Sequence, residues 1–404
     1  MCRETKVVVV GGGVLGTSAA IHLLRAGVGH VTLVERDGVA QGTSGAGAGF
    51  VAPWSLGSPD ECGAEEAALA DYAIDFYREL NAARPEAPYR QRGCLWMAQT
   101  ERDWPSVERR HTEGPADSRI VEPEEIEKLT GGVVRAAGIL RGVYHPSSAQ
   151  ISAERATRAL AALFAAEGGT LRERTPVRGL VVEDGRIAGV DTAHGRIEAD
   201  RVVIAAGAWT NAVLAELGQS LPIAPIAVSR IVTEPLGMPG DLPLLFVKAL
   251  DSGLKKSIWV REEDGRLMFG ANYDTPSRLT FIEDGVPERF DQVDLDGVLE
   301  VKRAAETLTT AIPALVEYKS FRIKHGAPCY TVDGRAIVGA LPGVGNLYVM
   351  AGCNEQGVTH GPGFGRVIAE TIAAGGSDFV DAAVWSPGRF EGEPQSPREV
   401  AAAL

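Results

Sequence analysis

The feature that most constrains this chain is a glycine-rich turn close to its first residues. Gly11, Gly13 and Gly16 form the pattern GxGxxG between an apolar run at residues 7–10 and a stretch of helical periodicity at residues 17–26. Glycines in these places allow a tight turn from strand to helix and let backbone amides approach a pyrophosphate. The pattern therefore predicts a βαβ unit that binds a dinucleotide, with the anion at the helix N-terminus.

An acidic residue completes this fingerprint. Glu35 follows the next apolar run, residues 31–34, at the distance where a carboxylate accepts hydrogen bonds from a ribose hydroxyl. An acid in this place disfavours a phosphate on the ribose, which argues against NADP. The competing interpretation is a plain glycine-rich turn with Glu35 in a surface ion pair, and the full βαβ context favours the dinucleotide site.

Two further segments bear on the choice between NAD and FAD, since the fingerprint serves both. Residues 42–49, GTSGAGAG, are too rich in glycine for a helix or a strand. They suit a loop that passes close to a flat group, although composition alone also fits a flexible linker. Residues 333–372 carry several glycines and a helix predicted to begin near Pro362, because proline suits the first helical turn.

Composition restricts the partners. The formal net charge of −13 opposes nonspecific attraction to nucleic acid or anionic lipid. The five cysteines show no CxxC spacing, so neither a disulfide framework nor a metal site is expected. No run approaches the roughly 20 apolar residues that span a bilayer, and the first apolar run is too short for a signal peptide. We expect a cytoplasmic protein that acts on a small molecule, without nucleic acid or an integral membrane segment.

The changing patterns along the chain predict an α/β fold of two interleaved domains. Continuous apolar runs at residues 202–206 and 347–351 suit central parallel strands. Antiparallel strands are predicted at 227–233, 257–261 and 266–270, helices at 64–80, 152–167 and 295–310, and a meander before residue 202. The expected units are a Rossmann-like dinucleotide-binding domain at 1–55, 145–215 and 325–385, an α+β substrate domain built on an antiparallel sheet at 56–144 and 216–324, and a loosely ordered tail at 386–404.

In their order, these segments resemble the D-amino acid oxidase superfamily, which includes glycine oxidase, sarcosine oxidase and dimethylglycine dehydrogenase. The resemblance spans nearly the whole chain. It is carried by VVVVGGGVLGTSAA with Glu35, the Thr43-Ser44 loop, Val177, VVIAAGAW at 202–209, YTVDG…VG at 330–339 and NLYVMAGCNEQGVTHGPGFG at 346–365.

The resemblance implies that the Rossmann-like domain binds FAD and that the substrate lies over the flavin on the antiparallel sheet. It also implies that the helix expected from Pro362 points its positive end at the pyrimidine side of the flavin. The residues expected to contact FAD are Gly11, Gly13, Val14, Leu15, Gly16, Glu35, Arg36, Thr43, Ser44, Gly47, Ala48, Gly49, Val177, Ala206, Gly207, Trp209, Gly339, Gly352, Glu355, Gln356, Gly357, Val358 and Thr359.

The chain departs from the family where a substrate carboxylate is usually held. Residues 327–329, Ala-Pro-Cys, stand where amino acid oxidases carry an arginine. Phe50-Val51 stands where sarcosine oxidases carry an arginine after the first glycine loop, and Thr359 stands where they carry a lysine. A substrate carboxylate then needs another partner, for which the candidates are Arg261, Arg322, Lys324 and His325.

The catalytic assignments follow from position alone. His360 lies beside the flavin loop, where a structural histidine is an equal alternative, and Tyr273 and Tyr330 could reach the pocket or serve as core residues. The candidate catalytic residues are His360, Tyr330, Tyr273 and Arg261. Cys329 is offset from the place where sarcosine oxidases attach flavin, so FAD is expected to be non-covalent. Residues 267–280 contain no lysine of the kind that promotes reaction with oxygen, so oxygen and another electron acceptor both stay open.

We therefore expect an FAD-dependent amine or amino acid oxidase or dehydrogenase. It would oxidise a C–N bond of a secondary amine or an N-substituted amino acid to an imine by hydride transfer to the flavin. The alternatives are a D-amino acid or glycine-type oxidase, an NAD-dependent dehydrogenase, and, from another class, a non-catalytic flavin-binding subunit of a larger complex.

Overall fold

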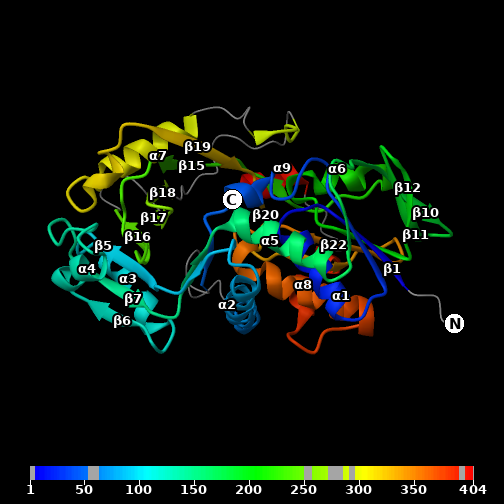
Figure 1. The fold of residues 1–404 in the computed structure, drawn as a ribbon, viewed down its shortest axis with the longest axis horizontal. Coiled ribbons are helices and arrows are strands. Elements are labelled where there is room, and N and C mark those ends of the chain that lie inside the picture. Colours follow the sequence, from blue (N-terminus) through cyan, green and yellow to red (C-terminus); the bar gives the residue numbers. More distant parts are fainter. Residues whose placement is uncertain are drawn as a thin grey trace.

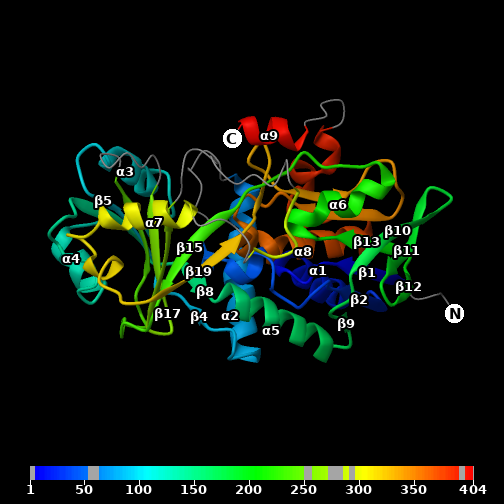
Figure 2. The same cartoon turned by 90° about the horizontal axis from the view of Figure 1, so that it is seen from above.

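The computed structural model describes residues 5–52, 63–249, 257–271, 285–290, 296–390 and 396–403. Figures 1 and 2 show two lobes built on separate sheets, with the long helix α2 (Ala64–Ala83) between them. Parallel and antiparallel strands occur together, so the predicted α/β class is confirmed. Across these ranges, no helix is both long and apolar enough to cross a membrane.

The first lobe contains a six-stranded sheet in the order β21-β22-β13-β1-β2-β9. Its strands run parallel except β21, which pairs antiparallel with β22 at one edge. Alternate residues of β1 pack into two different core clusters, Val7 and Val9 on one face and Val8 and Val10 on the other. This burial on both faces explains the continuous apolar runs. The strands are β1 (Lys6–Val10), β2 (His30–Val34), β9 (Thr170–Arg172), β13 (Arg201–Ile204), β21 (Ile337–Ala340) and β22 (Leu347–Ala351).

Helices α1 (Val14–Arg25), α5 (Ala153–Ala166) and α8 (Gly357–Ala374) pack with α2 into the larger of these clusters. Two glycines of α8 allow this helix to pack closely against α1 and α2. A Cβ atom on Gly365 would lie 2.6 Å from the carbonyl carbon of Ser18 in α1, and one on Gly363 would lie 2.4 Å from a methyl carbon of Leu69 in α2. Side chains at these two positions would force the helices apart.

The second lobe contains an eight-stranded sheet in the order β19-β15-β18-β17-β16-β5-β7-β6. Ile231 and Phe269 face a core cluster that includes α7 (Asp296–Glu306), whereas Val232 and Trp259 face the opposite side together with Phe50. The strands are β5 (Cys94–Ala98), β6 (Arg119–Val121), β7 (Arg141–His145), β15 (Val228–Thr233), β16 (Leu244–Lys248), β17 (Ile258–Glu263), β18 (Arg266–Ala271) and β19 (Phe321–Gly326).

Smaller elements complete the fold. The predicted meander is present as an antiparallel three-stranded sheet. The elements are η1 (Thr43–Ala46), β3 (Phe50–Val51), β4 (Tyr89–Arg90), α3 (Trp104–Thr112), α4 (Pro123–Leu129), β8 (Ala149–Ile151), β10 (Val177–Glu183), β11 (Arg186–Thr192), β12 (Gly195–Glu198), η3 (Gly207–Trp209), α6 (Thr210–Leu214), η4 (Ala215–Leu217), β14 (Ala224–Pro225), η7 (Pro313–Leu315), β20 (Cys329–Tyr330), η8 (Ala382–Trp385), η9 (Pro387–Phe390) and α9 (Pro397–Ala403).

The start predicted for the last long helix was wrong. Helix α8 begins at Gly357, and Pro362 lies inside it. Proline has no N–H, so the carbonyl of Val358 loses its helical donor. The hydroxyl of Tyr77 in α2 donates to that carbonyl over 3.0 Å, which satisfies the oxygen and lets the helix continue.

Two other local predictions were also wrong. Residues 42–49 do not form only a loop, because η1 forms a helical turn within them. The tail is not loosely ordered throughout, because α9 buries Val400 against Ala224 and Ile226. The domain boundaries predicted from the sequence stay a proposal.

Candidate active site

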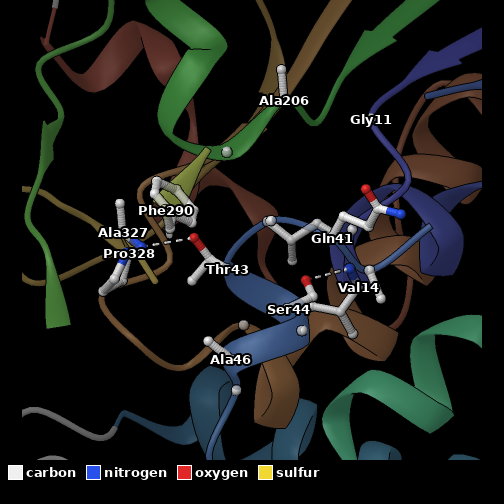
Figure 3. A pocket seen from close by; sticks show the side chains of 18 of the residues that line it. Gly11, Val14, Gln41, Thr43, Ser44, Ala46, Ala206, Phe290, Ala327 and Pro328 are labelled. Atoms are coloured by element: carbon white, nitrogen blue, oxygen red, sulfur yellow. Dashed lines mark hydrogen bonds between the residues drawn. The ribbon is translucent and has the colours of Figure 1, made fainter. Parts of the chain in front are cut away.

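A cavity of about 780 Å³ is lined by residues of both lobes. Its walls include the glycine-rich turn, residues 42–50 from the loop with η1, residues 352–359 except 354 and 356, and part of the β15 and β19 strands. Figure 3 shows this arrangement, with Val14 and Ser44 on one side and Ala327 and Pro328 across from them. The cavity therefore joins the three segments that the sequence analysis singled out.

The glycine-rich turn is held by close backbone contacts. A Cβ atom on Gly11 would lie 2.4 Å from the carbonyl oxygen of Ala205, and one on Gly16 would lie 1.9 Å from the carbonyl oxygen of Gly11. Gly13 caps α1 without a side-chain hydrogen bond, and the amide of Val14 donates to the Ser44 hydroxyl over 2.9 Å. Both the first turn of α1 and the loop that supplies Ser44 thus border the cavity.

Glu35 lies at the end of β2, and its carboxylate lines the cavity. It accepts hydrogen bonds from the amide of Gly12 over 2.6 Å and from the amide of Asp37 over 2.9 Å. Burial raises the pKa of Glu35, while the two amide hydrogen bonds act in the opposite direction. The carboxylate therefore holds the turn in place and keeps further acceptor capacity on the cavity side.

Trp209 forms an aromatic part of the wall. The guanidinium carbon of Arg36 lies 4.5 Å from the centre of the Trp209 ring, and the Phe290 ring stacks on it with centroids 5.1 Å apart. The indole Nε1 is buried and has no hydrogen-bond partner among the described residues. Burying an N–H donor of this kind costs free energy unless a ligand or a water molecule accepts a hydrogen bond from it.

The loop at residues 42–49 is tied to both lobes. Thr43 accepts a hydrogen bond from the amide of Ala327 over 3.0 Å (Figure 3). Lys324 on β19 donates to the carbonyl of Gly45 and to the carboxylate of Glu154, each over 3.0 Å. The ion pair between Lys324 and Glu154 therefore helps to hold the loop in place.

The second loop, which leads into α8, contains two non-glycine residues in the left-handed region. Asn354 has a φ of 47° and Glu355 a φ of 67°. The Asn354 side chain accepts from the amide of Thr331 over 3.0 Å and donates to the carbonyl of Gly352 over 2.6 Å. Strain of this kind persists where surrounding contacts determine the backbone, and it concentrates at functional sites. Here it places Glu355 in the cavity wall.

Most of the residues predicted to hold a cofactor line this cavity. The three that do not are Gly16, which supports the turn from behind, Gly339 on β21 near Pro387, and Gln356, which caps α8. The predicted residues in the lining are Gly11, Gly13, Val14, Leu15, Glu35, Arg36, Thr43, Ser44, Gly47, Ala48, Gly49, Val177, Ala206, Gly207, Trp209, Gly352, Glu355, Gly357, Val358 and Thr359.

The predicted catalytic residues are placed differently. His360 is buried in α8 with its ring edge-on to Phe364, and burial lowers the pKa of His360 to about 4. Tyr330 lies on β20 behind the cavity lining, where burial and the charge of Glu355 raise its pKa well above the ordinary value. Tyr273 falls outside the described residues.

Arg261, which was also considered for a substrate carboxylate, faces main-chain groups. Its Nη1 donates to the carbonyls of Ala48 and Ile151, and its Nη2 lies 3.4 Å from the carboxylate of Glu263. It lines a second, smaller cavity and not the main one. We therefore propose that Arg261 positions residues 47–49 and does not bind substrate.

Of the other charged candidates, His325 and Lys324 line the main cavity, whereas Arg322 is exposed outside it. The Nδ1 atom of His325 lies 2.9 Å from the Ser229 hydroxyl, and burial lowers the pKa of His325. A residue that the sequence analysis missed, Arg230 of β15, also lines the cavity and is only 8% exposed. The one available signal was a single cation inside the otherwise apolar and small-residue strand VSRIVT.

Comparison with known proteins shows extensive similarity. The family described as DAO, FAD dependent oxidoreductase, matches residues 6–371. The chain is 29% identical over 396 residues to 4-methylaminobutanoate oxidase (formaldehyde-forming) of Paenarthrobacter nicotinovorans, covering 94% of this chain and 45% of that protein. It is 29% identical over 392 residues to glycine oxidase of Pseudomonas aeruginosa, covering 95% of this chain and 98% of that protein.

The fold has a similar counterpart among solved structures. L-proline dehydrogenase from P. horikoshii superposes with a TM-score of 0.80 at 20% sequence identity, covering 97% of this chain and 99% of that one. The chain spans about half the length of the first curated relative named above and nearly all of the second.

Proposed function

We propose that this chain, which belongs to the DAO family of FAD-dependent oxidoreductases, oxidises a C–N bond of a secondary amine or an N-substituted amino acid. The proposal rests on one observation: the same cavity is bordered by the glycine-rich turn and by the face of an antiparallel sheet. The name of the 4-methylaminobutanoate oxidase relative supports an N-alkylated substrate.

The residues around the cavity fit FAD. The first turn of α1 offers backbone amides to a pyrophosphate, and the carboxylate of Glu35 has acceptor capacity for a ribose. The unpaired indole N–H of Trp209 offers a donor to a bound group. A volume of about 780 Å³ also falls within the range of cofactor and ligand pockets.

We further propose that FAD is held without a covalent bond. Cys329 and Cys353 both line the cavity, and burial raises the pKa of both thiols, that of Cys353 to about 11. A thiolate is the nucleophilic form of cysteine, so thiols of this kind are poor candidates for attachment. Denaturation in acid should release all the yellow colour into the supernatant and leave a polypeptide of unmodified mass; flavin that stays with the protein would refute this part.

When bound, FAD supplies the acceptor for the hydride that leaves the carbon next to the amine nitrogen. The chain has to hold the amine in its neutral form, because a protonated nitrogen opposes this transfer. His325 lines the cavity, and because burial lowers its pKa its imidazole is neutral near pH 7, so it adds no positive charge beside the amine. The aromatic and apolar side chains of Phe50 and Trp259 exclude water from the same region of the cavity.

A second candidate function within the same class is the oxidation of glycine or another primary amino acid. The glycine oxidase relative supports it, since the match covers 98% of that protein. The products separate the two. An N-methylated substrate oxidised at its methyl group gives, after hydrolysis of the imine, formaldehyde and the demethylated amine, whereas a primary amino acid gives ammonia and a 2-oxo acid.

The experiment is product analysis by mass spectrometry with purified holoprotein, using oxygen or an artificial dye as acceptor. Formation of an aldehyde and an amine from N-alkyl substrates, with no turnover of primary amino acids, supports the leading proposal. Ammonia and oxo acid as the only products would replace it with the second candidate.

A further inference from the structure

We propose that Arg230 on β15 is the specificity-determining residue of this cavity and that it binds the carboxylate of the substrate. The inference rests on the proposed function for its chemical context. It narrows the substrate class to amines that carry an anionic group. The argument depends on where Arg230 lies, on which groups surround it, and on what the other cations of the site already do.

Arg230 is a buried cation that has no hydrogen-bonded or ion-paired partner among the residues that the structure describes. Its Nη1 atom is buried and has no acceptor for its hydrogen bonds, and within the described ranges the side chain makes neither a hydrogen bond nor an ion pair. The guanidinium carbon lies 5.5 Å from the centre of the Trp259 ring, which is a weak cation–π contact. Leaving a charge buried in this state costs free energy unless a ligand pairs with it.

Two arginines beside the smaller neighbouring cavity, buried Arg261 and half-buried Arg90, show the contrast. Arg261 donates to two carbonyls and approaches Glu263, and Arg90 pairs with the buried carboxylate of Glu262. Both of these cations have carbonyl or carboxylate partners within the protein. Arg230 does not, although it lies in the same sheet as Arg261.

The surroundings of Arg230 favour a carboxylate over a bulky polar group. Val232 on the same face of β15, together with Trp259 and Met268, gives this face of the sheet an apolar and aromatic character. In such surroundings a guanidinium binds a carboxylate strongly, because its planar fork donates two parallel hydrogen bonds and little water competes.

The other cations on the two strands that flank this part of the cavity, β15 and β19, are engaged or lie outside it. Lys324, which stands opposite Arg230 in the β15–β19 register, is paired with Glu154 and the Gly45 carbonyl. His325 lies against Ser229, and Arg322 is exposed outside the cavity. Among the cations that β15 and β19 contribute to the described cavity wall, Arg230 is therefore the one whose donors remain available.

Glu355 gives the main competing explanation. Its charge is the strongest favourable influence on the Arg230 guanidinium, although the two groups form no ion pair. If Arg230 only balanced the charge of Glu355, Arg230→Lys, which keeps that charge, would bind an acidic ligand as the parent protein does. If the planar guanidinium binds a carboxylate, Arg230→Lys would weaken the binding of the acidic ligand and leave that of a neutral ligand unchanged.

The test compares an acid with its amide. Propionate and propionamide are titrated into the holoprotein, and binding is followed by isothermal calorimetry and by the shift of the flavin absorbance band. Arg230→Met should weaken propionate binding by about 30-fold or more, the lower end for losing a buried charge pair, and leave propionamide binding unchanged. The propionate affinity of Arg230→Lys should fall between those of the parent protein and Arg230→Met. The exposed control Arg322→Met should bind both ligands as the parent protein does.

The inference would be overturned if Arg230→Met lost affinity for propionate and propionamide equally, or if the parent protein showed no preference for propionate. These binding measurements do not need turnover. A parent protein that binds propionate through Arg230 while no amine reduces its flavin would therefore refute the proposed oxidation and keep this inference. If Arg230→Met does not fold, the Arg230→Lys and Arg230→Gln proteins decide the matter by the same comparison.

Discussion

The hydroxyl of Tyr77 donates a hydrogen bond over 3.0 Å to the carbonyl of Val358, one helical turn before Pro362. This contact joins α2 to the turn of α8 that borders the cavity. It supplies from another helix the donor that a proline cannot supply from its own. The placement of the α8 N-terminus beside the candidate active site therefore depends on a residue nearly three hundred positions away in the chain, at a separation of 281.

Tyr77→Phe should lower the free energy of unfolding by about 1–3 kcal/mol, because it leaves the Val358 carbonyl buried without a donor. Urea denaturation measures this change. In the background of Pro362→Ala, which restores a helical N–H, the same substitution should cost much less. An equal cost in both backgrounds would show that the hydroxyl acts in some other way. Tyr89→Phe, whose hydroxyl bonds to exposed Gln91, is the matched control.

Gly16→Ala should abolish tight FAD binding even though alanine favours helices by about 1 kcal/mol over glycine. The added Cβ atom would lie 1.9 Å from the carbonyl oxygen of Gly11, so the turn has to move away from its bound geometry. A Cβ atom on Gly376 would have no neighbour within 4 Å, which makes Gly376→Ala the control. Fluorescence titration of the apoprotein with FAD measures both affinities. Unchanged affinity in Gly16→Ala would contradict the role assigned to the turn.

The protein should lose stability as the pH falls from 6.5 toward 4, in part because of His360. Burial lowers the pKa of His360 from 6.5 to about 4. Between these values the unfolded chain binds a proton that the folded protein excludes, so unfolding is favoured as the pH falls. Above pH 6.5 both forms are neutral and the residue contributes no pH dependence.

His22 and His145 have similarly lowered pKa values of about 4, so the effect is shared among three residues. Urea unfolding at pH 7.5 and pH 5 should show a smaller difference in stability for His360→Gln than for the parent protein, by roughly 1–2 kcal/mol. A parent-like pH dependence in His360→Gln would mean that the buried imidazole is not excluded from protonation.

The sequence predicted the glycine-rich turn because its signals are local. Gly11 and Gly16 act through backbone geometry that a short motif already specifies. Ser44 acts through its side-chain hydroxyl, which accepts from the amide of Val14, and the helical turn η1 around it was not predicted. The apolar runs that form the central parallel strands were equally clear. A strand buried on both faces needs apolar residues at every position, as in residues 7–10.

The errors arose where partners come from distant parts of the chain. A proline is a sound sign of a helix start unless another side chain, here Tyr77, satisfies the carbonyl that it leaves free. Arginines on strands cannot be ranked from the sequence, because Arg261 and Arg230 differ only in what surrounds them in space. Arg261 donates to two main-chain carbonyls, whereas Arg230 lines the cavity and makes no hydrogen bond or ion pair with the described residues.

The most direct test of the central claim is an anaerobic absorbance titration of the purified holoprotein with N-alkyl amino acids, primary amino acids and simple amines. The account predicts an oxidised flavin band that N-alkyl amino acids bleach and that returns when oxygen or another acceptor is admitted. A flavin band that none of these compounds bleaches would contradict the proposed oxidation and favour a non-catalytic flavin-binding subunit.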